Sequence, residues 1–165
     1  QVDEYLRAAP HIWAMGDVAG SPQFTYVSLD DYRIVRDQLF GEGKRTTRDR
    51  SLLPTSVFTT PALTQIGMTE TQAAASGRPY EVKRLQTVAI PKAKVLGETH
   101  GLLKAIVDKE TGLILGATLF CPEAHELINL LKLAMDHQVP ASALHTQIFT
   151  HPTIAEALND LFAPN

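Results

Sequence analysis

The chain has 165 residues, of which 44% are apolar, and a formal net charge of −3 with six histidines. This length and composition are typical of one ordinary globular domain with a possible appendage. Because no basic stripe and no long apolar run is present, we expect neither nucleic acid nor a membrane as a partner.

The first residues predict a short strand that ends in a turn. Residues 1–7 are charged and lack the apolar core of a signal peptide, and the chain starts without methionine, so we expect a fragment or a processed product. The apolar run 12–15 predicts a strand that Gly16 and Asp17 end. A helix is predicted across residues 26–39, followed by a charged linker.

Beyond residue 50 the pattern changes to short strands and short helices. Thr69 and Gln72 form a capping-box pattern that begins a helix, and Gly77 can end it. Gly112 fits the positive-φ position of a hairpin between two strands. The predicted strands are 56–60, 63–67, 81–90, 102–108 and 113–120.

Two amphipathic helices complete the predicted fold. One starts at Pro122, and the other follows Thr153 with an apolar stripe that runs from Ile154 to Phe162. Strands grouped together and flanked by helices indicate an α+β fold, in which an antiparallel sheet packs against helices.

Two groups of residues could carry chemistry. Gly16 lets a backbone approach closely, and the Asp17 carboxylate can accept hydrogen bonds from a ligand hydroxyl, although a plain Gly-Asp turn has the same pattern. In His151-Pro152-Thr153-Ile154-Ala155-Glu156, imidazole titrates near neutral pH and a carboxylate can support it. The open alternative is that Glu156 only caps the last helix and His151 is a solvated loop residue.

Both groups resemble motifs of the FAD-dependent class I pyridine nucleotide-disulfide oxidoreductases. The run 12–18 is similar to their second FAD-binding motif, and His-Pro-Thr-x-x-Glu resembles the signature near the C-terminus of glutathione, lipoamide and mercuric reductase-like enzymes. The resemblance covers nearly the whole chain. It implies that residues 1–47 are the C-terminal segment of the FAD-binding domain and that residues 48–165 are the dimerisation domain.

The resemblance also implies roles for individual residues. Asp17 after Gly16 would bind a ribityl hydroxyl of FAD, and a helix N-terminus at Phe24 and Thr25 would face the pyrimidine edge of the flavin. Tyr26 replaces a proline that is frequent in the family. In the dimerisation domain, the histidine of the signature would be the general acid/base for the redox-active thiols of the opposite subunit, and the glutamate would orient it.

The parent protein implied by this resemblance is a cytoplasmic homodimer that passes electrons from NAD(P)H through FAD to a cysteine pair. The run 24–35 resembles more narrowly the branch that defends bacteria against reactive chlorine species and hypothiocyanous acid. This chain lacks the N-terminal Gly-x-Gly-x-x-Gly, the Cys-x4-Cys pair and the nicotinamide domain. We therefore expect it to be inactive by itself and to bind no cofactor, and its ending without a cysteine pair disfavours mercury as a substrate.

Two alternative functions stay open: a non-catalytic dimerisation module with a structural histidine and glutamate, and a flavin reductase of the single-cysteine oxidase or peroxidase type. Other candidate sites are weaker. His125-Glu126 lacks the second histidine of a zinc helix, and the run 41–44 lacks the glycine spacing of a phosphate loop. The lone Cys121 has no disulfide partner, which fits a reducing compartment, and a buried apolar role is expected for it.

Overall fold

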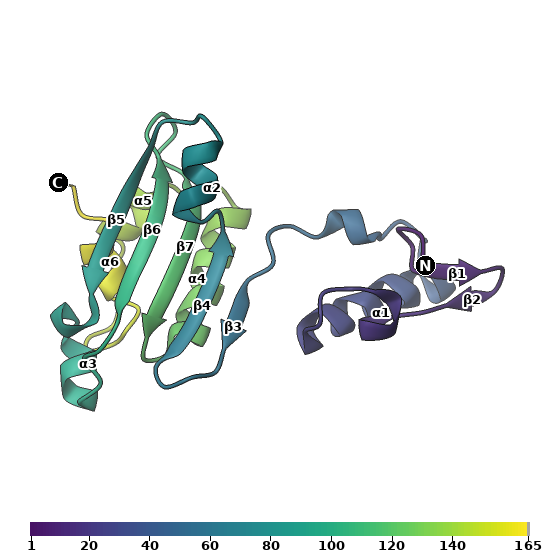
Figure 1. The fold of residues 1–165 in the computed structure, drawn as a ribbon, viewed down its shortest axis with the longest axis horizontal. Helices are drawn as coiled ribbons and strands as arrows, with labels where there is room; N and C mark the ends of the chain where they lie inside the picture. The colour runs from purple at the N-terminus through teal and green to yellow at the C-terminus, as the bar shows by residue number, and fades with distance from the viewer. Residues whose placement is uncertain (165) are drawn as a thin grey trace. The chain divides into compact units, whose positions relative to one another are not determined.

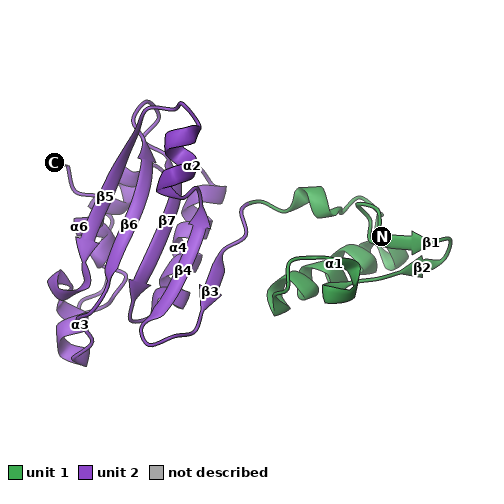
Figure 2. Cartoon of the chain, viewed as in Figure 1, with its two compact units in different colours: residues 1–51 green, residues 52–165 purple. Residues whose placement is uncertain are grey.

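The structure, a computed structural model, describes residues 1–164 and divides into two compact units (Figure 2). The first unit comprises residues 1–51, and the second begins at Leu52. Each unit has its own set of buried side chains. None of the helices among the described residues is long and apolar enough to cross a membrane.

The first unit is built on one long helix and a two-stranded antiparallel sheet. The helix begins after Phe24 and ends at Gly41, as the sequence predicted, and it buries Val27 and Ile34. The predicted strand 12–15 is shorter in the structure, and its partner strand was not predicted. The elements are β1 (Arg7–Ala9), β2 (Ile12–Trp13) and α1 (Thr25–Phe40).

The second unit is an α+β fold around a five-stranded antiparallel sheet, which confirms the predicted fold class (Figure 1). The strand order is β3-β4-β7-β6-β5, so the last strand in sequence lies at the centre. Alternate residues of that strand, Ala117, Leu119 and Cys121, are buried on one face. The strands are β3 (Thr55–Val57), β4 (Ala62–Gly67), β5 (Tyr80–Gln86), β6 (Leu102–Asp108) and β7 (Ile114–Cys121).

Helices cover this buried face of the sheet. In Figure 1, α4, α5 and α6 lie behind the sheet, whereas α2 lies in front of it. Glu70 of α2 accepts hydrogen bonds from Arg84 and Lys104 of the strands, whose side chains alternate with the buried ones. The helices are α2 (Glu70–Ala75), α3 (Pro91–Leu96), α4 (Ala124–Asp136), α5 (Ala141–Thr146) and α6 (Ala157–Leu161).

The structure differs from the predicted elements in several places; the strand predicted over 56–60 ends at Val57, and the helix predicted from Pro122 begins at Ala124. The strand predicted over 81–90 ends at Gln86, because a tight turn follows and Pro91 then begins α3 at the first helical position. Helix α5 was not predicted. The last helix begins at Ala157, four residues beyond Thr153, because the chain first forms a turn between them.

We predict that the buried face of α4 carries much of the stability of the second unit. Leu131 is 0% exposed and Leu133, on the same helix, is 56% exposed. Leu131→Ala should lower the free energy of unfolding by about 2–5 kcal/mol through lost burial and a cavity. The matched control Leu133→Ala should change it by less than about 0.5 kcal/mol. Urea unfolding followed by circular dichroism tests this, and equal effects of the two substitutions would contradict it.

Cys121 is a buried core residue, as the sequence predicted. Burial at the end of β7, with a smaller contribution from the charge of Glu123, raises the pKa of its thiol to about 12. The thiolate is the nucleophilic form of cysteine, so this thiol is inert at neutral pH.

We therefore predict that Cys121 reacts with Ellman's reagent only when the protein unfolds. At neutral pH the folded chain should show almost no reaction over a period in which the chain in denaturant releases one equivalent of chromophore. Rapid reaction of the folded chain would show that the thiol is accessible and ionisable.

Candidate functional site

The predicted His151–Glu156 pair forms in the structure. The Nδ1 atom of His151 lies 2.7 Å from Oε2 of Glu156. The second carboxylate oxygen, Oε1, accepts the backbone N–H of Thr153 at 2.9 Å, and the Thr153 hydroxyl accepts the N–H of Glu156 at 3.2 Å. The reciprocal capping contacts and the histidine contact are therefore both present, each on its own carboxylate oxygen.

The protonation of this pair follows from its geometry. The hydrogen bond from His151 lowers the pKa of the Glu156 carboxyl; burial opposes this shift, and the Thr153 amide adds to it. At neutral pH the carboxylate is ionised and can only accept, so Nδ1 of His151 must carry the hydrogen. Nε2 then faces away, and it has no hydrogen-bond partner among residues 1–164. With 68% of the His151 side chain exposed, a second molecule can reach this nitrogen.

Asn159 fixes the loop that leads to His151, a role that the sequence did not indicate. Its amide nitrogen lies 2.9 Å from three carbonyl oxygens, those of Leu144, His145 and Gln147. The Asn159 carbonyl lies 2.8 Å from Nδ1 of His145. These contacts connect the end of α5 to α6, so the residues before His151 have a defined path. An asparagine in a helix gives no sequence signal for such distant acceptors.

The second predicted group lies in the first unit, at the N-terminus of α1. Gly16 is buried with φ 73°, and the exposed Asp17 follows it. The Asp17 carboxylate has no hydrogen-bond partner among the described residues, whereas the Gly16 N–H donates to Asp31 at 2.7 Å. Phe24 is the N-cap residue of α1 but provides no side-chain cap, and Thr25 is the first helical residue.

These residues are compatible with FAD. A Cβ atom on Gly16 would lie 3.1 Å from the Ser28 hydroxyl oxygen, which is a tight contact, and φ at Gly16 is 73°, so glycine suits this close approach to α1. The exposed Asp17 carboxylate can accept from ribityl hydroxyls, and a helix start without a side-chain cap leaves backbone N–H groups for a polar ring edge. The Phe24 amide is already used, because it donates to the Pro22 carbonyl at 2.8 Å.

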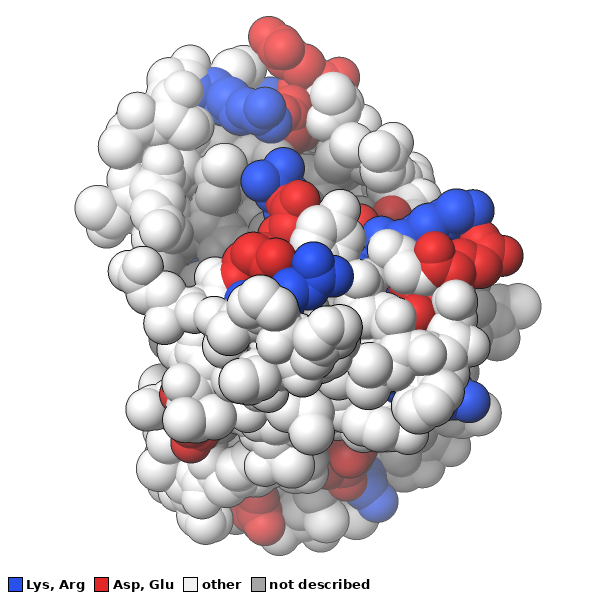
Figure 3. Space-filling model, turned by 90° about the vertical axis from the view of Figure 1, so that its right-hand side faces the viewer, with Lys and Arg blue, Asp and Glu red and all other residues white. Residues whose placement is uncertain are grey.

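Among the described residues, no group of three or more His, Cys, Asp or Glu side chains could hold a metal ion. On the face that Figure 3 shows, Lys and Arg lie beside Asp and Glu, with uncharged surface between the groups. The Lys44–Glu42 and Arg45–Asp30 ion pairs are examples of this mixing.

The two predicted groups lie in different units. Gly16, Asp17, Phe24 and Thr25 belong to the first unit, and the His151–Glu156 pair belongs to the second. Each group is therefore a partial site, with its own exposed acceptor.

Comparison with known proteins agrees with this architecture. Residues 53–162 match the family described as "Pyridine nucleotide-disulphide oxidoreductase, dimerisation domain". The chain is 57% identical over 163 residues to the probable pyridine nucleotide-disulfide oxidoreductase RclA of Escherichia coli, covering 98% of this chain and 37% of that protein. It is also 35% identical to a mercuric reductase of Streptomyces lividans, over 95% of this chain and 33% of the relative.

A solved structure shows the same fold. The HOCl-induced flavoprotein disulfide reductase RclA from Escherichia coli superposes with a TM-score of 0.96 at 57% identity, covering 98% of this chain and 38% of that one. The chain thus spans little more than a third of the length of these relatives. The match over residues 53–162 and the identity to the relatives place this chain in the pyridine nucleotide-disulphide oxidoreductase family, with that family's dimerisation domain as its second unit.

Proposed function

We propose that this chain is part of an FAD-dependent NAD(P)H:disulfide or thiol-type oxidoreductase, in which it forms the homodimer interface and supplies an acid/base pair to the partner subunit. The observation that carries the proposal is the 2.7 Å contact between His151 and Glu156, which leaves Nε2 of the ring exposed. The relatives' names, pyridine nucleotide-disulfide oxidoreductase and flavoprotein disulfide reductase, support the same reaction class.

In this proposal His151 moves a proton at Nε2. A thiolate attacks a disulfide or an electrophilic substrate, and the thiol that leaves must be protonated. With Nδ1–H held by Glu156, Nε2 can take a proton from one thiol and return it to another. The ionised Glu156 stabilises the charged imidazolium that exists between these two steps.

The first unit would hold part of the flavin. FAD, when bound, accepts hydride from NAD(P)H and passes two electrons to the cysteine pair of the parent. Asp17, presented by Gly16, would bind a ribityl hydroxyl, and the N-terminus of α1 at Phe24 and Thr25 would lie at the polar edge of the ring. In this assignment the segment 1–47 belongs to the FAD-binding domain of a cytoplasmic protein.

A second candidate, a dimerisation module with a structural His-Glu pair, has one observation in its favour. Glu156 and Thr153 make the reciprocal contacts of a capping box, which would stabilise the turn that leads into α6 without any chemistry. The cap uses only Oε1, however. Oε2 and the exposed His151 contribute nothing to that cap, so a purely structural role leaves the contact between Oε2 and His151 unexplained.

We predict that His151→Gln in the full-length flavoprotein lowers thiol-linked turnover by roughly 10²–10⁴-fold, because the general acid/base is lost. Glu156→Gln should lower it less, by roughly 10–100-fold, since glutamine keeps an acceptor for the Thr153 amide but loses the charge beside the imidazolium. Steady-state kinetics with a disulfide substrate measures both effects.

The flavin absorbance spectrum and flavin content serve as the control for these variants. Both should stay close to those of the unmodified protein, because neither residue is part of the flavin-binding group. Unchanged thiol turnover in both variants would reject the acid/base role and favour the structural module.

We also predict that this chain is a dimer in solution. Several large apolar side chains of the second unit are exposed, including Phe58 at 77%, Val95 at 69% and Ile148 at 92%, and association can bury such surface. Size-exclusion chromatography with light scattering should give twice the chain mass of 18.1 kDa across a wide concentration range. A monomer at every concentration would show that association requires parts of the parent outside this chain.

A further inference from the structure

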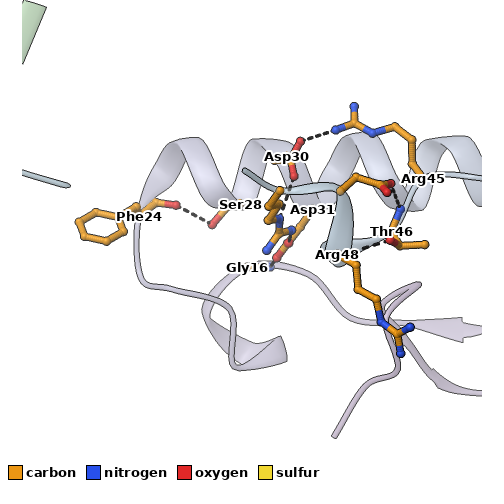
Figure 4. Close-up of polar contacts among 10 residues, drawn as sticks. Gly16, Phe24, Ser28, Asp30, Asp31, Arg45, Thr46 and Arg48 are labelled. Atoms are coloured by element: carbon orange, nitrogen blue, oxygen red, sulfur yellow. Dashed lines mark hydrogen bonds and ion pairs between the residues drawn. The ribbon is translucent and has the colours of Figure 1, made fainter. Parts of the chain in front are cut away.

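The turn that carries Asp17 is attached to α1 by one buried side chain. Oδ2 of Asp31 accepts the N–H of Gly16 at 2.7 Å, across fifteen residues of sequence. Asp31 lies in the second turn of α1 and is 0% exposed. Figure 4 shows Asp31 pointing from the helix toward Gly16, with Ser28 beside it. Gly16 and Asp17 begin a short 3-10 helix, Gly16–Ala19, and a carboxylate of α1 holds the N–H of its first residue.

A fully buried carboxylate needs compensation for its lost hydration. Arg50 provides it: its guanidinium contacts Oδ1 of Asp31, and its Nε donates to Oδ2 of Asp30 at 2.8 Å. The Arg50 side chain is 11% exposed, so this is a largely buried cluster rather than a surface ion pair. Asp30 is also paired with Arg45 at 2.7 Å, and it makes no contact with Gly16.

The cluster thus has two separable parts. Charge balance involves both Asp30 and Asp31 with Arg50, whereas the contact with the turn involves Asp31 alone. The bond to Gly16 satisfies a buried backbone N–H, and the charge balance alone does not require it. The additional bond to Gly16 fixes a glycine in the left-handed region, with φ 73°, at the point where the chain presents the Asp17 carboxylate.

We propose that Asp31 is a positioning residue for flavin binding: through the Gly16 amide it fixes Asp17 relative to the N-terminus of α1. The inference rests on the proposed function, in which Asp17 binds the ribityl chain. Asp31 does not touch the flavin in this arrangement. Asp31 orders the turn at Gly16 and Asp17 before the flavin binds, so that flavin binding does not lose free energy in ordering this turn.

The test compares four variants of the full-length flavoprotein by titrating FAD into the apoprotein and following the quenching of flavin fluorescence. Asp31→Ala removes the acceptor for Gly16 and should raise the FAD dissociation constant by roughly tenfold or more, since a hydrogen bond to a charged group is lost. Asp30→Ala removes the other partner of Arg50 and should raise it by less than about threefold. Asp31→Asn keeps an acceptor and should retain most of the affinity, although the protein loses stability.

Asp17→Ala is the reference for the proposed function in the same titration. If it leaves FAD affinity unchanged, the flavin site itself is assigned wrongly. If it weakens binding while Asp31→Ala behaves like Asp30→Ala, the flavin site stands and the positioning role of Asp31 is wrong.

Thermal melting of each apoprotein identifies variants that do not fold. Should Asp31→Ala fail to fold, Asp31→Leu fills the same space without an acceptor and gives the same comparison. The visible absorbance of the bound flavin provides a second measurement. A misplaced Asp17 should shift the flavin bands in the Asp31→Ala or Asp31→Leu protein, whereas a cluster that serves stability alone would leave them as they are in Asp30→Ala.

Discussion

The position of the His151–Glu156 pair depends on the burial of one face of the five-stranded sheet. Because β7 is central and buries alternate residues, helices must cover that face, and α6 is one of them. Ile154, Leu158 and Leu161 of the C-terminal segment are each at most 2% exposed, which fixes the rotation of this segment against the sheet. Glu156 lies between Ile154 and Leu158 in the sequence, and its carboxylate contacts His151. The packing of the C-terminal segment against the sheet thus determines where the exposed His151 lies.

A carboxylate with two tasks is the common device of both units. Glu156 holds the Thr153 amide with one oxygen and His151 with the other. Asp31 holds the Gly16 amide with one oxygen and contacts Arg50 with the other. In each case one carboxylate oxygen binds a backbone amide, and the other contacts a basic side chain. Such a carboxylate links the order of the local backbone to the position of a basic side chain. Replacing it by Gln or Asn keeps an acceptor for the backbone amide but removes the negative charge, so the two tasks can be separated.

Much of the fold could be predicted from the sequence, because long elements repeat their apolar period several times. Strand β6 and helix α1 matched their predicted ranges closely, whereas the six-residue helices α3 and α5 contain too few turns to show a helical period. The motif indicated His151 with Glu156, and their contact is confirmed, while their catalytic roles stay predictions. Asp31 and Asn159 were missed because their partners lie 12 or more residues away, or in another element.

In the proposed function, each of the two groups needs a reacting partner that residues 1–164 do not supply. Glu156 orients His151, whose side chain is 68% exposed, and the proposed proton transfer requires Nε2 to lie within hydrogen-bond reach of the reacting atom. Asp17 is likewise held in place and has no partner among residues 1–164. Each group is oriented by a carboxylate, Glu156 for His151 and Asp31 for the Gly16 amide beside Asp17, and each is exposed, which is the arrangement expected when neighbouring domains or a second subunit complete the site.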